Sequence, residues 1–136
     1  MNKPSAALRW IACITPFFFL AACAQAPVVK PPESMGLMDI TERPAERALL
    51  SGLRAYDDGQ YPEAERQLND SLRAGLVSAK DRAAAHKHLA FVYCTSRREA
   101  LCEFSFRAAR SAFPAFALTK SEAGHPLWGP VYKRLN

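Results

Sequence analysis

The stretch from Leu89 to Pro114 constrains the fold more than any other part of the chain. It reads LAFVYCTSRREALCEFSFRAARSAFP, and its apolar residues recur at the spacing of two amphipathic helices joined by a short turn. One cysteine lies near the end of the first helix and another lies early in the second. The pattern therefore predicts an α-helical hairpin, which Pro114 ends because proline cannot continue a helix interior.

A similar pair of helices precedes this stretch. Pro44 suits the first position of a helix, and small or apolar residues then recur at helical spacing up to Tyr56. The segment Asp57–Gln60 predicts a turn. A further helix follows from Tyr61 and is expected to end at Gly75, because glycine readily adopts the left-handed conformation at a helix terminus. We expect an all-α domain made of two helical hairpins.

The two hairpins repeat each other with an offset of 38 residues. The aligned pairs are Gly52 with Ala90, Ala64 with Cys102, Leu68 with Phe106, and Ser71 with Ala109. This succession of small, small, bulky and small residues resembles the tetratricopeptide repeat, whose usual period is about 34 residues. Small residues let paired helices approach, and an excess of four residues is close to one helical turn of about 3.6.

The resemblance covers residues 45–114 and implies which side chains form the repeat core. These are Gly52, Tyr56, Ala64, Leu68, Leu89, Ala90, Tyr93, Phe106 and Ala109. A generic antiparallel four-helix bundle is the alternative fold, and the common register of four aligned positions argues against it. Two units are few, because stacked repeats generally need three or more to bury a continuous core.

The carboxyl-terminal tail is expected to cover the open side of the second hairpin. Leu101, Phe104 and Ala108 are apolar but lie off the face used by Cys102 and Phe106, and a helix that is apolar on two sides needs two neighbours. We expect the tail to supply the second neighbour.

Local signals in the tail support a capping role. Thr119–Glu122 predicts a capping box, and Pro130 can begin a short helix carrying Val131 and Tyr132. Leu127 and Trp128 would then cover the hairpin. We assign His125, Pro126, Trp128 and Pro130 to this C-terminal cap, with a binding role for the same residues as the alternative.

The amino-terminal segment predicts export. Lys3 and Arg9 precede an apolar run at Trp10–Leu20, which is shorter than the about 20 residues that a membrane span requires. The run ends in Leu20-Ala21-Ala22-Cys23, which resembles the lipobox of bacterial lipoproteins. The resemblance implies cleavage before Cys23, lipid on its thiol and, because Ala24 rather than Asp follows, an outer-membrane location facing the periplasm. The alternative is a plain secretory signal cleaved near Ala22.

These signals divide the chain into three parts. Residues 1–22 form a lipoprotein signal peptide, residues 23–40 form the lipidated cysteine and an extended tether, and residues 41–136 form the helical domain with its cap. Prolines in the tether favour an extended chain, which at about 3.1 Å per residue reaches on the order of 50 Å. Its apolar far end, residues 35–40, either continues this extension or packs on the domain.

The cysteines predict one disulfide. Cys13 leaves with the signal and Cys23 is consumed by lipid, so Cys94 and Cys102 remain in an oxidising compartment. Seven residues separate them across the turn between antiparallel helices, which can bring their α-carbons to disulfide distance. Two buried thiols and a redox-active pair are the alternatives, although the spacing is not C-x-x-C.

The sequence lacks the residue patterns that nucleic-acid binding, metal binding or catalysis would require. The net charge is +5, and it falls to +3 without Lys3 and Arg9, so no nucleic-acid footprint is indicated. His86 and His88 are two apart and cannot hold one metal ion from the same helix face. No phosphate loop, G-x-S-x-G or H-E-x-x-H motif is present. We expect no catalysis, no metal, no small-molecule substrate and no cofactor beyond the covalent lipid on Cys23.

Four segments together resemble small tetratricopeptide-like lipoproteins of proteobacteria, some of which accompany type VI secretion clusters. The segments are LAACAQAP, AYDDGQYPEAE, KHLAFVYC and EAGHPLWGPVYKRL, and the second cysteine, Cys102, belongs to the same combination. This resemblance implies a membrane-anchored adaptor that binds an envelope or secretion-machine protein. A periplasmic immunity protein against a toxin and a thiol-redox protein are the alternative functions.

Overall fold

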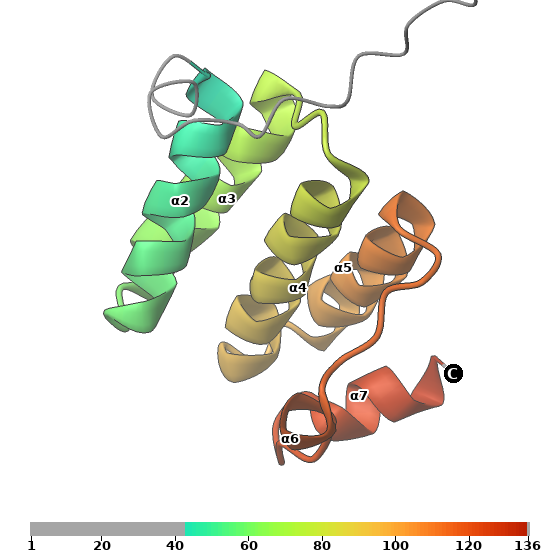
Figure 1. Cartoon of the computed structure of the whole chain (residues 1–136). Helices are drawn as coiled ribbons and strands as arrows, with labels where there is room; N and C mark the ends of the chain where they lie inside the picture. The colour runs from blue at the N-terminus through green and yellow to red at the C-terminus, as the bar shows by residue number, and fades with distance from the viewer. Residues whose placement is uncertain (1–42, 136) are drawn as a thin grey trace, which may run out of the picture. The chain divides into compact units, whose positions relative to one another are not determined.

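The computed structural model describes residues 43–135, so the predicted signal peptide, Cys23 and the tether lie outside the described part. Within this part the chain contains six helices and no strand, which confirms the predicted all-α class (Figure 1). The helices are α2 (Pro44–Asp57), α3 (Tyr61–Ala74), α4 (Ala79–Thr95), α5 (Glu99–Ala112), α6 (Lys120–Ala123) and α7 (Gly129–Arg134).

The four long helices form two hairpins, α2 with α3 and α4 with α5. Helix α4 is the centre of the domain, because it contacts α2, α3 and α5. A helix surrounded in this way needs apolar residues on every side. Its buried residues are Ala83, Ala85, Leu89, Ala90, Phe91, Val92, Tyr93 and Cys94.

Side-chain contacts between α3 and the second hairpin join the two units. Arg98 donates to both carboxylate oxygens of Glu65, at 2.9 and 2.6 Å, and its guanidinium lies 4.6 Å from the ring centroid of Tyr93. Such a two-pronged pair fixes orientation more firmly than a single contact. The Glu65 carboxylate accordingly raises the pKa of Arg98.

Local sequence signals set several helix ends. Gly75 ends α3 in the left-handed conformation, at φ 88°. At the start of α4, Ser78 Oγ accepts a hydrogen bond of 3.2 Å from the backbone N–H of Asp81. The capping box predicted at Thr119–Glu122 is present at the start of α6.

The tail packs on the second hairpin through aromatic side chains. The Trp128 ring stacks on Phe91 at a centroid distance of 4.2 Å, and Tyr132 meets Phe106 edge-on at 5.3 Å. Trp128 and Tyr132 are 9% and 7% exposed. Burying aromatic rings supplies a large apolar area, so a short segment can cover the hairpin.

The predicted cover of the outer face of α5 is wrong. Leu101 and Phe104 remain 43% and 64% exposed, and Leu127 is 52% exposed. The physical reason is that Trp128 and Tyr132 pack on the buried rings of Phe91 and Phe106. The tail therefore covers those rings and leaves the outer face of α5 open.

Candidate functional site

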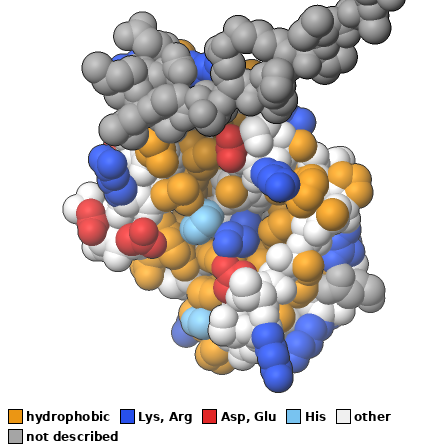
Figure 2. Space-filling view, in the orientation of Figure 1, with side chains coloured by type: hydrophobic (Ala, Val, Ile, Leu, Met, Phe, Trp, Pro, Cys, Tyr) orange, Lys and Arg blue, Asp and Glu red, His pale blue; other side chains and the backbone are white. Residues whose placement is uncertain are grey.

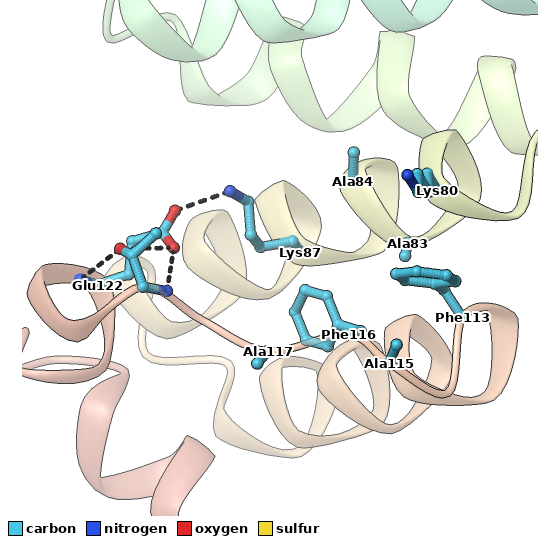
Figure 3. A pocket seen from close by; sticks show the side chains of 10 residues that line it. Lys80, Ala83, Ala84, Lys87, Phe113, Ala115, Phe116, Ala117 and Glu122 are labelled. Carbon is cyan, nitrogen blue, oxygen red and sulfur yellow. Dashed lines mark hydrogen bonds and ion pairs between the residues drawn. The ribbon is translucent and has the colours of Figure 1, made fainter.

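An open pocket of about 270 Å³ lies between α4 and the connection from α5 to α6 (Figure 3). We call it the α4 pocket. Its lining consists of small and aromatic side chains with a few charged groups: Lys80, Ala83, Ala84, Lys87, Phe113, Ala115, Phe116, Ala117, Thr119 and Glu122.

The local sequence explains why space remains here. Phe113 has extended backbone angles and precedes Pro114, so α5 stops and the connection runs on without helical structure. The facing surface of α4 carries alanines at 83 and 84, which are too short to fill the gap. Phe116 packs against the core and anchors the middle of the connection.

One side of the α4 pocket is formed by an ion pair. Lys87 Nζ lies 2.7 Å from Glu122 Oε1, and these side chains are 22% and 25% exposed. Burial acts to raise the pKa of Glu122, but the hydrogen bonds from Lys87 and Thr119 outweigh it and lower that pKa. Glu122 is therefore ionised at neutral pH and compensates the charge of Lys87.

Lys80 is the second basic group of the α4 pocket, and its charge is not compensated in the same way. Its side chain is exposed, and Nζ lies 5.9 Å from the ring centroid of Phe113. Among residues 43–135, no carboxylate lies within ion-pair distance of it. The pocket thus combines an apolar lining with one unbalanced positive charge.

A row of aromatic rings adjoins the pocket and links both hairpins to the tail. The successive rings are Tyr61, Tyr56, His88, Phe91, Trp128 and His125, with centroids between 3.4 and 5.8 Å apart. In the space-filling view, hydrophobic side chains gather over this face around a histidine, a basic and an acidic side chain (Figure 2).

Burial shifts the pKa of two rings in this row, His88 and Tyr56. It lowers the pKa of His88, whose Nδ1 lies 2.8 Å from the carbonyl oxygen of Ala84, and that contact opposes the shift only in part. Burial likewise raises the pKa of Tyr56. Both rings are held in their neutral forms at neutral pH, which suits a packed aromatic surface.

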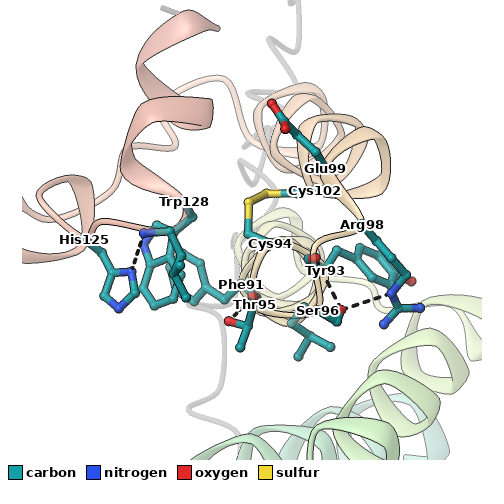
Figure 4. The surroundings of a disulfide bond; sticks show 12 residues. Phe91, Tyr93, Cys94, Thr95, Ser96, Arg98, Glu99, Cys102, His125 and Trp128 are labelled. Carbon is teal, nitrogen blue, oxygen red and sulfur yellow. Dashed lines mark hydrogen bonds between the residues drawn. A yellow bond between two sulfur atoms is a disulfide. The ribbon is translucent and has the colours of Figure 1, made fainter.

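The structure contains the disulfide between Cys94 and Cys102, with α-carbons 5.2 Å apart (Figure 4). It closes the α4–α5 turn. Cys94 is 8% exposed and Cys102 is fully buried at 0%. Thiol exchange requires access of a thiolate to sulfur, so this environment suits a structural bond better than a catalytic one.

The structure places the eight aligned positions of the two hairpins in buried surroundings. Each is 2% exposed or less, apart from Gly52, which is also buried. A Cβ at Gly52 would lie 2.8 Å from Leu68 Cγ, so α2 and α3 approach too closely here for any side chain. Leu89 and Tyr93 are 2% and 8% exposed, whereas Tyr56 is half-buried.

The tail residues singled out from the sequence have unequal surroundings. Trp128 is buried, donates from Nε1 to the carbonyl oxygen of Glu122 at 2.9 Å, and stacks on His125 at a centroid distance of 3.4 Å. Pro126 and Pro130 are exposed, and Pro130 lies in the first turn of α7.

Sequence reasoning missed the α4 pocket. A signal was available in Lys80 and Lys87, which are seven residues apart and so lie on one helix face. The segment after Pro114 was the other half of the site. Nothing in its residues shows that it crosses α4.

No cluster of three or more histidine, cysteine or acidic side chains within residues 43–135 could bind a metal ion. No helix in the same range has the length and apolar character to cross a membrane. No protein-family model, curated protein or solved structure matches the chain.

Proposed function

We propose that this chain is a lipid-anchored adaptor of the periplasm-facing outer membrane, in which two tetratricopeptide-like hairpins present a binding pocket to an envelope protein. The α4 pocket carries the proposal. It is open and mostly apolar, and it lies between α4 and the connection that leads from α5 into the tail. A partner from a type VI secretion machine is the specific case that the sequence resemblance favours.

The helix boundaries support the tetratricopeptide-like assignment. Helices α3 and α5 begin 38 residues apart, at Tyr61 and Glu99, and end 38 residues apart, at Ala74 and Ala112. Their buried small and bulky residues keep the same offset. Shared boundaries and burial are expected of a duplicated unit, and a generic bundle has no need of them.

The anchoring part of the proposal rests on the sequence around Cys23. A cysteine that carries several acyl chains is held stably at a membrane, whereas a single chain binds only weakly. A Cys23→Ser variant should lose both radiolabelled palmitate and sedimentation with vesicles. If the variant keeps both the palmitate label and the sedimentation with vesicles, the proposed lipid anchor and membrane location are wrong.

The binding part is tested by affinity capture of the tagged full chain from detergent-solubilised envelope. Enrichment of baseplate or membrane-complex proteins of a secretion machine supports the adaptor. Recovery of one small toxin instead would assign the chain to immunity proteins. If no protein is enriched over an unrelated lipoprotein, the binding function is wrong.

A further inference from the structure

We propose that the α4 pocket recognises a peptide segment of the partner in which one apolar side chain lies beside a single carboxylate. The inference rests on the proposed adaptor function and names the chemistry that its binding site selects. It follows from three properties of the pocket, which are its apolar lining, its unbalanced charge and its fixed wall.

The lining provides the apolar contact. Four alanines and the rings of Phe113 and Phe116 surround a space of about 270 Å³. An aliphatic side chain placed there exchanges water for methyl groups and aromatic carbon on both sides, which is favourable in proportion to the buried area. A polar side chain of similar size would lose its hydration without a matching set of partners.

The charges select one carboxylate. Lys87 already pairs with Glu122 at 2.7 Å, whereas the Lys80 ammonium lies over the Phe113 ring, 5.9 Å from its centroid. A ligand carboxylate near Lys80 compensates that charge. A second carboxylate deeper in the pocket would approach Glu122 and be repelled, because like charges in a partly buried site interact strongly.

The wall opposite Lys80 is rigid before any ligand binds. The Glu122 side chain accepts hydrogen bonds from the backbone of Thr119 at 2.9 Å and from Lys87, and its own carbonyl oxygen accepts from Trp128. Groups fixed in this way lose little conformational freedom on binding, which favours affinity for a short peptide.

The first test uses the purified full chain and fluorescein-labelled peptide amides. The probe peptide is Gly-Ser-Leu-Asp-Ser-Gly, and its matched controls replace Leu by Ser or Asp by Asn. We expect about tenfold weaker binding without the leucine and up to about fivefold weaker binding without the carboxylate. The probe peptide amide carries its carboxylate on the aspartate side chain, whereas a peptide acid that ends in leucine carries it at the chain terminus. Comparing the binding of these two peptides distinguishes a side-chain carboxylate from a terminal one.

The second test assigns these preferences to the pocket. Lys80→Met should abolish the preference for Asp over Asn, while Lys133→Met, an exposed lysine outside the pocket, should leave it unchanged. Ala117→Trp fills the pocket from an exposed position and should weaken all peptides. Thermal melting of each variant shows that the fold is intact.

Three results would overturn the inference. They are equal binding of the Leu and Ser peptides, equal binding of the Asp and Asn peptides by the unchanged chain, and a preference for Asp that survives Lys80→Met.

Envelope capture distinguishes a failure of this inference from a failure of the proposed adaptor function. If the unchanged, Lys80→Met and Ala117→Trp chains capture a partner equally, the adaptor function is supported but the partner does not bind in this pocket. If the chain selects peptides as expected but captures no partner, the pocket chemistry is supported and the adaptor function is wrong.

Discussion

The two hairpins have turns of matching backbone geometry but are held by different side chains. In their turns, Gln60 N–H donates to the carbonyl oxygen of Ala55 at 2.7 Å, and Arg98 N–H donates to that of Tyr93 at 2.8 Å. These donors and acceptors are again 38 residues apart. Each turn also contains one residue with a positive φ, which is Gly59 in the first hairpin and Arg97 in the second.

The side chains at matched positions differ. Tyr56 and Ala64 of the first hairpin correspond to Cys94 and Cys102 of the second, so a packed ring is replaced by a covalent bond. The first hairpin packs on the second through α4, whereas the second hairpin packs on the first through α4 and on the short helix α7 through α5. The second hairpin therefore adds a disulfide and stacked aromatic contacts with the short tail to its packing against the first hairpin.

The outer faces differ as well. On α3 the exposed pair Glu63 and Arg66 is bonded within the helix, at 2.6 Å. The matched positions on α5 hold Leu101 and Phe104, both exposed. The matched positions of the two hairpins therefore differ at the surface, where the second hairpin is apolar and the first is charged.

The largest expected effect compares the bulky core residue of each hairpin. Phe106→Ala should reduce the free energy of unfolding by about 3–5 kcal/mol and Leu68→Ala by about 2–5 kcal/mol. Because Phe106 contacts Tyr132, only Phe106→Ala should also speed hydrogen exchange in α7. Equal exchange in both variants would show that the tail does not depend on the second hairpin.

Removing the disulfide tests whether the second hairpin needs it. Replacing Cys94 and Cys102 together by serine should cost about 2–3 kcal/mol in the chain-entropy account of a short loop. Denaturant unfolding measures the change, and reductant should shift the unchanged chain toward the variant. If the two chains unfold alike under oxidising conditions, the bond contributes nothing and the comparison of the hairpins fails.

Gly52 lies where α2 and α3 of the first hairpin approach closely, and a substitution there tests this approach. Gly52→Ala should destabilise by about 1–3 kcal/mol through overpacking, although alanine alone favours a helix by about 1 kcal/mol. The cause is the Cβ contact with Leu68, which is fully buried and cannot move away. Shortening that neighbour in a Gly52→Ala, Leu68→Val double variant should recover part of the loss. Stabilisation by Gly52→Ala would contradict the close approach.

The turns should respond in opposite directions. Gly59 and Arg97 both have positive φ, at 73° and 59°, a conformation that costs a non-glycine residue about 1 kcal/mol or more. Gly59→Arg should therefore destabilise by about 1 kcal/mol, and Arg97→Gly should stabilise by a few tenths once the flexibility of glycine is subtracted. Thermal melting measures both, and changes of the same sign would rule out a shared turn.

The smallest effect depends on pH. Burial holds the pKa of His88 below its ordinary value of 6.5, so below pH 6.5 the unfolded chain binds more protons than the folded one. Stability should therefore fall as the pH is lowered through this value toward the folded pKa. His88→Gln should flatten that slope in denaturant titrations, and an unchanged slope would show that His88 is not buried.

The sequence predicted the elements that depend on local chemistry. The helix starts near Pro44 and Thr119, the stop at Gly75 and the disulfide each follow from a few adjacent residues or from one spacing. The 38-residue register predicted which side chains share a face. Periodicity identifies a face and cannot say which neighbour covers it.

The sequence-based predictions were wrong where tertiary packing decides which segment covers a helix face. Leu101 and Phe104 were expected under the tail, but the tail packs on Phe91 and Phe106 instead. The α4 pocket was missed for the same reason, because it depends on the path of residues 113–119 across α4. That path is set by tertiary packing, which a single sequence does not display.

Site-specific photocrosslinking in living cells tests most directly that the second hairpin and the tail, rather than the first hairpin, bind the partner. A photoreactive phenylalanine replaces Ala117 in the α4 pocket or, as the control, the exposed Ala74 at the end of α3. We predict one defined envelope adduct from position 117, reduced by Lys80→Met, and none from position 74. The same adducts from both positions, or an adduct from position 74 alone, would contradict the account.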